Sequence, residues 1–375
     1  MHNRVSAGMI PVAEGGATGG PLFDCCWGSG AEGKQKQQQL VNVIYAACGK
    51  ALQKFIVPLF LSRVAFFCCF VTFLSFPFLG LKRLPCACLQ KKKKQLLEED
   101  DDEDDEVGEI FDTVMQISGN LFKMEGPLCT EAFNQHVAPV YSKILQNGMA
   151  NADYASEHSA GVLAAICAFA DAVDCGGPQA IALYGVPALA AFLRFVQSDT
   201  QQLPAPAEGD EEDEGEDEDD ILRCQASAFG LGCLAQRAPE VVRPRLSEVV
   251  SALNLCFQHP RLSERRLVID CAVCALTKII SQFAGDLGVP TCAARVQKIV
   301  SEWLPVTEDE QEAWTTHDFL FDLLEAQRTE IINPQDPQIR THLRRIFEHL
   351  HSHPELLSYP SRHSQRLLKI APMVQ

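Results

Sequence analysis

The chain has 375 residues, 47% of them hydrophobic, with 49 Asp and Glu against 32 Lys and Arg and a formal net charge of −17. This length suggests two or three ordinary domains or one elongated array, and the apolar content excludes general disorder. Residues 98–106 are nine consecutive acids and residues 208–220 hold eleven more, so 29 acids face 32 bases elsewhere. The rest of the chain is nearly neutral at about +3 and has no basic stripe to neutralise many phosphates, which disfavours a nucleic-acid-binding body.

The N-terminal region is expected to begin with a disordered leader over residues 1–38, followed by an amphipathic helix over residues 39–53. Residues 1–20 contain no apolar stretch long enough for a cleavable signal peptide. Most of the sixteen cysteines lie inside apolar helical patterns, as Cys167, Cys233, Cys256 and Cys271 do. Buried free thiols are typical of a reducing compartment, and we therefore expect the protein in the cytoplasm and nucleus.

Residues 54–90 form an apolar segment that has three interpretations. Val64–Leu81 is 18 residues without a charge between Arg63 and Lys82, which suits a minimal membrane-spanning helix. A buried helix is the second interpretation, although six phenylalanines distributed around a helix suit no amphipathic position. The third is a translated intron, because Phe, Ser, Leu and Pro codons are pyrimidine-rich, like the tract before a splice acceptor.

Residues 91–107 are expected to form a lysine-rich and acidic linker. From residue 108 to residue 375 the apolar residues recur with the period of an α-helix. One such face comprises Val242, Leu246, Val249, Val250, Leu253 and Phe257, and another comprises Val268, Ala272, Leu276, Ile279 and Phe283. No sustained strand-like alternation appears. Helix ends are predicted at Gly126-Pro127, Gly176-Gly177-Pro178, Pro239, Pro260, Pro290, Pro334 and Pro337.

The predicted helices pair into units of similar length. First helices are expected near Ile110, Ala155, Ile221, Ser263 and Glu308. The long step between the second and third contains a polar, acidic insertion over residues 199–220. Units of roughly 40–47 residues built from two helices are typical of HEAT and armadillo repeats. The predicted fold is therefore an all-α solenoid, a superhelix of about five HEAT/armadillo-like hairpins with disordered acidic loops.

One predicted helix carries a HEAT-like packing signature. Asp220 is placed to cap its first amides, and Arg223 and Ala226 follow at the spacing of the HEAT pattern. Gly230 and Gly232 would let neighbouring backbones approach closely. An ordinary amphipathic helix is the alternative.

Four motifs, in the same order, resemble the importin-β (karyopherin-β) family, and most closely the C-terminal HEAT repeats of its importin-β3 branch. They are an acidic linker leading into residues 107–122, the CAFADAVD run at 167–174, the RCQASAFGLGCLAQ run at 223–236, and the Trp303-Leu304-Pro305 stretch with the helix after it. The resemblance covers about residues 91–372.

The resemblance implies a HEAT-repeat nuclear transport receptor that carries basic protein cargo through nuclear pores, with nucleoporins as candidate partners and release by the Ran GTPase. The family's N-terminal arch, which supplies most contacts to Ran, has no counterpart in these 375 residues. The expectation is a fragment, a partial gene model or a reduced relative of the family. The family implies Ran as a partner, but the absent arch leaves Ran binding by this chain open.

The acidic blocks are the candidate contacts for basic cargo, because a dense anionic segment attracts Lys/Arg-rich signals and speeds their encounter. A solvated loop that keeps the chain soluble is the alternative. The main candidates are Asp210, Glu211, Glu212, Asp213, Glu214, Glu216, Asp217, Glu218, Asp219 and Asp220, and the weaker ones are Asp100, Asp101, Asp102, Glu103, Asp104 and Asp105.

Other motifs favour structural roles. Cys271 and Cys274 have half the spacing of a zinc site but lie in one helical pattern, and no metal is expected. His349, His351 and His353 are interpreted as a surface cluster, and Trp303 and Trp314 as packing residues in preference to a nucleoporin site. Neither a phosphate loop nor a nucleophile motif is found, so the sequence predicts no enzyme and no cofactor.

Two other functions compete with transport. A generic HEAT scaffold would organise a protein complex without any requirement for basic partners. A membrane-tethered helical adaptor would follow if residues 64–81 span a bilayer, and the location would then be a membrane.

Overall fold

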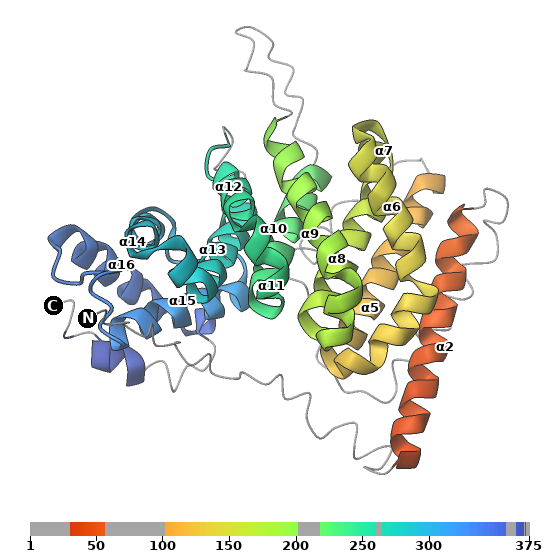
Figure 1. The fold of residues 1–375 in the computed structure, drawn as a ribbon, viewed down its shortest axis with the longest axis horizontal. Coiled ribbons are helices and arrows are strands. Elements are labelled where there is room, and N and C mark those ends of the chain that lie inside the picture. Colours follow the sequence, from red (N-terminus) through yellow and green to blue (C-terminus); the bar gives the residue numbers. More distant parts are fainter. Residues whose placement is uncertain are drawn as a thin grey trace, which may run out of the picture. The chain divides into compact units, whose positions relative to one another are not determined.

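The computed structural model describes residues 31–56, 102–201, 218–259, 265–357, 365–370 and 372. Within these ranges the chain forms thirteen α-helices, 88% of the residues are helical and none lies in a strand (Figure 1). The predicted all-α class is confirmed. The described residues fall into two compact units that divide between Tyr184 and Gly185. They are called here the N-terminal unit and the C-terminal unit.

The N-terminal unit contains α2 (Ala31–Ile56), α5 (Asp102–His136), α6 (Ala138–Ala150), α7 (Ala152–Glu157), α8 (Ser159–Cys175) and the first turns of α9 (Gly177–Gln201). Helix α5 packs against both α2 and α8, and α6 packs against α8 (Figure 1). The backbone of α5 leaves helical geometry at Gly126, directly before Pro127, where the sequence predicts a break. Pro127 cannot continue the hydrogen-bond ladder, so the helix changes direction there.

Aromatic side chains fill the core of this unit. Phe133 is fully buried at the centre. Its ring centroid lies 5.2–5.9 Å from four others, in edge-to-face geometry, and these rings belong to Tyr45, Phe122, Phe169 and Tyr184. Aromatic pairs prefer this geometry because the ring edge is positive and the face negative. The cluster joins residues from α2, α5, α8 and α9 in one contact.

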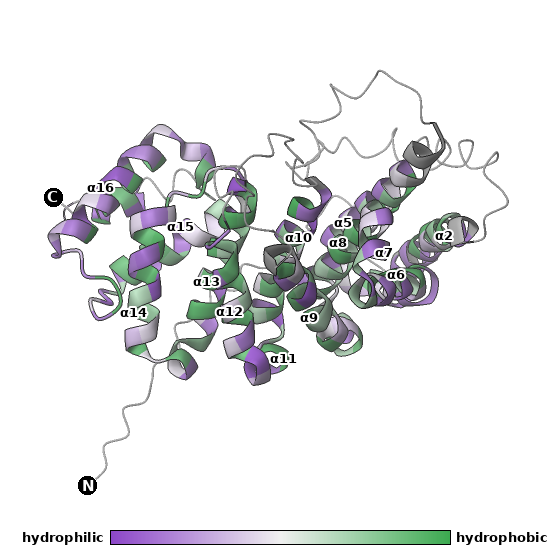
Figure 2. Cartoon of the chain, turned by 90° about the horizontal axis from the view of Figure 1, so that it is seen from above, coloured by the Kyte–Doolittle hydropathy of each residue, from purple (hydrophilic) through white to green (hydrophobic). Residues whose placement is uncertain are grey.

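The C-terminal unit contains the rest of α9, α10 (Glu218–Arg237), α11 (Pro239–Val242), α12 (Leu246–Cys256), α13 (Arg266–Leu287), α14 (Val289–Lys298), α15 (Glu310–Glu325) and α16 (Pro337–Ser352). Short 3-10 turns cover Arg243–Arg245 and Pro354–Leu356, and a π-helical turn covers Ile299–Trp303. Helix α13 packs against α10, α12, α14 and α15. Figure 2 shows hydrophobic residues along α13 and hydrophilic residues along much of α16.

The predicted apolar faces are buried in this unit. Val268, Ala272, Leu276, Ile279 and Phe283 are each at most 3% exposed, which confirms the face assigned to that helix. In the preceding face, Val242, Leu246, Val249, Val250 and Leu253 are buried and Phe257 is half-buried. All described cysteines are free, and most are buried, as the apolar pattern predicts.

Several helix boundaries coincide with the predicted breakers. Pro239, Pro290 and Pro337 lie at the first or second position of α11, α14 and α16, where a proline loses no helical hydrogen bond. Gly177 and Gly288, which follow the ends of α8 and α13, have positive φ angles of 73° and 80°. This left-handed conformation is unfavourable for residues that have a Cβ atom. Pro187, in contrast, lies inside α9 without ending it.

The ends of several predicted segments need correction. Helix α2 begins at Ala31, so residues 31–38 are helical and not part of a disordered leader, and it ends at Ile56 instead of residue 53. Helix α5 begins at Asp102, inside the predicted linker. Acidic residues are favourable in a first helical turn because they face the positive end of the helix dipole. The predicted insertion at 199–220 is shorter at both ends, because α9 reaches Gln201 and α10 begins at Glu218.

Two described helices, Gly177–Ser198 and Arg266–Leu287, are long and apolar enough to cross a bilayer. In the apolar 18-residue stretch of each helix, 78% is buried in Arg266–Leu287 and 56% in Gly177–Ser198. Core helices of water-soluble proteins meet the same criterion, and the packing of α13 on four neighbours accounts for its apolar length. The segment Val64–Leu81, for which a membrane helix is one prediction, lies outside the described residues.

Candidate functional site

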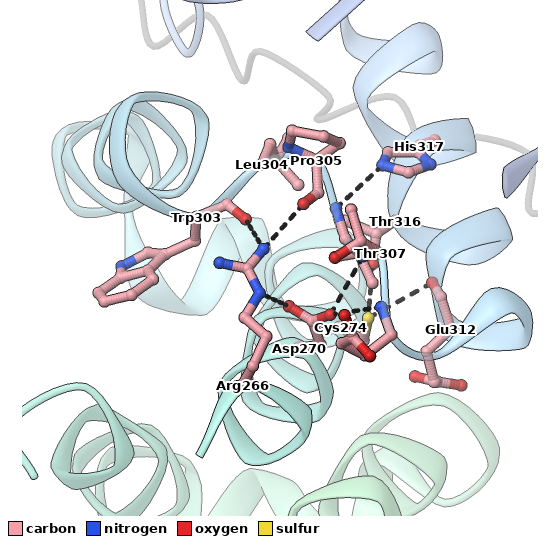
Figure 3. Close-up of polar contacts among 12 residues, drawn as sticks. Arg266, Asp270, Cys274, Trp303, Leu304, Pro305, Thr307, Glu312, Thr316 and His317 are labelled. Atoms are coloured by element: carbon pink, nitrogen blue, oxygen red, sulfur yellow. Dashed lines mark hydrogen bonds and ion pairs between the residues drawn. The ribbon is translucent and has the colours of Figure 1, made fainter. Parts of the chain in front are cut away.

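A polar cluster in the C-terminal unit holds the segment that joins Trp303 to α15 (Figure 3). From the first turn of α13, Arg266 donates from Nη2 to the carbonyl oxygens of Trp303 at 3.1 Å and Pro305 at 2.9 Å. One turn later, Asp270 Oδ2 accepts the N–H groups of Thr307 at 3.1 Å and Glu308 at 3.0 Å. Two α13 side chains therefore satisfy backbone groups that no helix or strand pairs.

Asp270 is fully buried, and this burial raises the pKa of its carboxyl above the usual value. The charge of Arg266 and the two backbone N–H groups act in the opposite direction. Arg266 Nε lies 2.9 Å from Asp270 Oδ1 as an ion pair four residues apart on the helix. Loss of Arg266 would leave a buried carboxylate without its cation, which is the costly way to break such a pair.

A second charged pair lies deeper between α13 and α15. Lys278 Nζ is 2.7 and 2.8 Å from the two carboxylate oxygens of Glu312, and the two side chains are only 6% and 7% exposed. Burial disfavours the charged lysine, but the Glu312 carboxylate outweighs it, so the pKa of Lys278 is raised. The ammonium also lies 5.2 Å from the centre of the Phe229 ring on α10. One lysine on α13 thus contacts both α15 and α10.

The Cys271-x-x-Cys274 pair lies inside α13 with both residues buried. Cys274 donates its thiol to the Glu312 carbonyl at 3.3 Å, and its sulfur accepts the Thr316 hydroxyl at 2.8 Å (Figure 3). Burial raises the pKa of the Cys274 thiol well above its usual value, which disfavours the thiolate that a metal or a nucleophilic reaction requires. Among the residues that the structure describes, no three His, Cys, Asp or Glu side chains are placed to hold a metal.

His317 connects the segment before α15 to the turn that follows α16. Its Nε2 accepts the Val306 N–H at 3.3 Å, and its Nδ1 lies 3.0 Å from the Leu356 carbonyl oxygen. An accepting Nε2 and a donating Nδ1 assign the neutral tautomer with the proton on Nδ1. The side chain is fully buried. The cluster as a whole is therefore suited to fixing the position of residues 304–309 and of the turn near Leu356.

An acidic stripe runs along α15, formed by Asp318, Asp322 and Glu325. These positions share one face of a helix because they are four and three residues apart. Arg366 contacts all three: its Nη1 donates to Asp318 at 3.0 Å, and its Nη2 lies 2.6 Å from Asp322 and 3.1 Å from Glu325. Its guanidinium carbon is 5.1 Å from the centre of the Phe321 ring. This stripe binds a cation, and it was not among the predicted contacts.

The predicted cargo contacts lie mainly outside the described residues. Glu218, Asp219 and Asp220 form the first turn of α10, while 210–217 precede the described part. Asp102, Glu103, Asp104 and Asp105 open α5, and Asp100 and Asp101 fall before it. The structure therefore places the ends of both acidic blocks at helix N-termini, and their interaction with cargo remains a prediction.

The residues of the predicted packing signature lie as follows. Asp220 is the third residue of α10, not the residue before it, and it pairs with the buried guanidinium of Arg223. Ala226 is half-exposed, whereas Ala228 is fully buried. Gly230 faces the ring of Phe192 on α9. A Cβ on Gly232 would lie 3.0 Å from the Ala275 Cα on α13, so these two helices are in close contact there.

The remaining motif residues are engaged in local packing. The Trp303 ring packs at a tilt against Phe257, with 5.2 Å between ring centroids, and Trp314 donates its indole N–H to the Glu355 carbonyl at 2.9 Å. His349 and His353 stack at 4.4 Å near the end of α16, and His353 Nδ1 lies 3.0 Å from Glu355 Oε1. These contacts agree with packing and surface roles.

The contacts of Arg266, Asp270 and Lys278 on α13 were not predicted from the sequence. The contact of Arg366 with the acids of α15 was not predicted either. One signal was present: Lys278 is a lone charge within the apolar run from Val273 to Ile280. A lysine surrounded by core residues needs a partner, but nothing local identifies Glu312 as that partner. Compared with models of known protein families, the sequence matches none.

Proposed function

We propose that the protein is a nuclear transport receptor of the importin-β type, or the C-terminal part of one, which binds basic protein segments. The observation that carries this proposal is the separation of charge. Residues 98–106 and 208–220 concentrate the acids, while the rest of the chain is nearly neutral. Such a distribution attracts Lys/Arg-rich partners without requiring a basic or catalytic surface.

The finer fold belongs to the same proposal: a solenoid of HEAT repeats. In the C-terminal unit, α10, α13 and α15 begin at Glu218, Arg266 and Glu310, close to the expected first helices at Ile221, Ser263 and Glu308. Helix α13 packs against both of the others. In the N-terminal unit, α5 packs against both α2 and α8. Pairing of each first helix with the next is what nearest-neighbour stacking of helical hairpins requires.

The block between α9 and α10 is the preferred cargo contact. It is bounded by Gln201 and Glu218, so both ends are anchored to helices of the same unit. A dense anionic segment of this kind raises the local concentration of cationic peptides, and the effect weakens as salt screens it. The proposed location is the cytoplasm and nucleus, with nucleoporins as further candidate partners.

The test is a binding titration of the full chain with a fluorescent peptide that carries two Lys/Arg clusters. The variant replaces the ten acids at 210–214 and 216–220 with Asn and Gln. A second variant replaces the six acids at 100–105, the weaker candidate contacts, and should lose less affinity. We expect the 210–220 variant to lose about tenfold or more in affinity, and the wild type to lose a similar factor on raising salt from about 50 to about 500 mM.

Unchanged affinity in the 210–220 variant would defeat the role of that block in cargo binding. Binding that does not respond to salt would favour a generic HEAT scaffold over a transport receptor. The helical signal in circular dichroism should be unchanged in both variants.

A further inference from the structure

The C-terminal segment, residues 365–370, is joined to the acidic stripe of α15 mainly by Arg366. Arg366 reaches Asp318, Asp322 and Glu325, and it is only 10% exposed. Ile370 is completely buried. Lys369 adds a looser contact at 3.8 Å from Glu325 and stays 67% exposed, and Leu368 is 76% exposed. Two of its six residues are therefore buried, Leu367 is half-buried, and the other three are exposed.

A six-residue helical segment has little stability of its own, because helix nucleation is unfavourable and isolated helices below roughly 12–15 residues are marginal. Its conformation therefore depends on what it contacts. The carboxylates that receive it keep substantial exposure, with 37% for Asp318 and 58% for Asp322. A surface that binds a short cationic segment while remaining this accessible can bind a similar segment from another molecule.

The chemistry of the contact defines its ligand. A guanidinium that pairs with several carboxylates and lies over an aromatic ring is bound by charge, by fixed hydrogen-bond directions and by cation–π attraction together. A lysine offers one point charge and lacks the planar fork. The spacing of Arg366, Lys369 and Ile370 puts two cations and an apolar side chain on one side of a helical turn.

We propose that the acidic stripe of α15 is a binding surface for arginine-containing amphipathic segments of partner proteins, and that residues 365–370 occupy it as an intramolecular ligand that limits access. An attached ligand acts at an effective concentration in the millimolar range. A partner segment therefore competes only when it binds more tightly or when the C-terminal segment is released. The inference rests on the proposed function in one respect only, that the natural partner is a basic protein segment.

The test uses the full chain and a fluorescent synthetic peptide with the sequence of residues 361–375. The variant Arg366→Ala/Ile370→Ala removes both anchors of the attached segment. We expect the peptide to bind this variant at least tenfold more tightly than the wild type. Adding Asp318→Asn and Asp322→Asn to the variant should abolish the gain, and a peptide carrying Arg366→Lys should bind the released variant several-fold more weakly.

Equal binding to the wild type and the released variant would overturn the proposal, as would binding that persists without the two aspartates. If the released variant does not fold, the wild type decides the matter. Peptide added well above the roughly millimolar effective concentration of the attached segment should accelerate hydrogen exchange at residues 365–370, and unchanged exchange would overturn the proposal. The acids at 210–220 are intact in every protein of this test. Failure here with a normal response in the earlier titration would therefore reject only the α15 surface.

Discussion

The two units are stabilised by different kinds of contact. In the N-terminal unit, Phe133 is surrounded by four other aromatic rings, and the burial of these side chains holds the helices together. In the C-terminal unit, Lys278 and Asp270 on α13 form buried charged contacts with α15 and with the segment before it. Apolar packing tolerates small changes of geometry. Hydrogen-bonded charges are stricter, because the donor–acceptor distance must stay within a few tenths of an ångström and the hydrogen bond must stay nearly linear.

This difference means that the two units should respond differently to the loss of one side chain. Removing one member of a buried charged pair leaves the other unpaired, and removing both can be nearly neutral. Removing a ring from an aromatic cluster costs packing that no second substitution of equal size restores. The predictions below test this contrast, beginning with the largest effect.

The first prediction concerns Lys278→Met. This change should destabilise the C-terminal unit by about 3–5 kcal/mol, because Glu312 would stay buried without its cation. The double variant Lys278→Met/Glu312→Leu should recover most of the loss. The free energy of opening can be measured by hydrogen exchange of the α13 amides. A double variant no more stable than the single one would show that the pair does more than neutralise two charges.

The second prediction concerns Phe133→Leu. The variant should destabilise the N-terminal unit by about 2–3 kcal/mol, through lost ring area and lost edge-to-face contacts. Hydrogen exchange of the α8 amides reports this loss. The half-buried Phe111, which contacts only the Tyr141 ring among the described aromatic pairs, provides the matched control, and Phe111→Leu should have a clearly smaller effect. Equal losses would argue against a central role for Phe133.

The third prediction compares two glycines of the C-terminal unit. A Cβ at Gly232 would lie 3.0 Å from the backbone of Ala275, whereas a Cβ at Gly285 meets no atom within 4 Å. Gly232→Ala should therefore destabilise by about 1–3 kcal/mol, because α10 and α13 must separate. Gly285→Ala should be neutral or stabilising by up to about 1 kcal/mol. Urea denaturation monitored by circular dichroism separates the two, and a harmless Gly232→Ala would remove close helix contact as the reason for this glycine.

The fourth prediction concerns pH. Burial raises the pKa of Asp171 to about 6, and the charge of Lys123 opposes the shift while that of Asp174 adds to it. The folded state then binds a proton more tightly than the unfolded state, so this carboxyl makes the unfolding free energy fall as pH rises from about 4 to 6. Asp171→Asn should remove that slope and stabilise the N-terminal unit at pH 7 by up to about 3 kcal/mol, since each pKa unit corresponds to about 1.4 kcal/mol.

The measurement is urea denaturation at pH 4.5 and pH 7.5, with the exposed Asp153 changed to Asn as the matched control. The difference between the two pH values should shrink in Asp171→Asn and stay as in the wild type in Asp153→Asn. Identical pH dependence in all three proteins would contradict the assignment of the titration to Asp171.

Much of the fold follows from local patterns. The recurrence of Val268, Ala272, Leu276, Ile279 and Phe283 predicts one helix and its buried face, and Pro239, Pro290 and Pro337 predict where helices begin. The candidate site is different. Arg266 and Asp270 look in sequence like the solvated charges of any helix, and Lys278 stands out only as a lone charge in an apolar run. Their partners are supplied by residues 303–312, which the local pattern does not identify.

The sequence by itself determined that the described part of this chain is helical, where most of its helices break and which faces are apolar, because backbone conformation and burial of an apolar stripe follow rules a few residues long. Only the tertiary structure decided which charges are buried, that Arg366 lies across three carboxylates of α15, and that Asp102 and Glu218 already belong to helices. Such outcomes depend on groups distant along the chain, where Coulomb attraction and desolvation nearly cancel and geometry sets the balance.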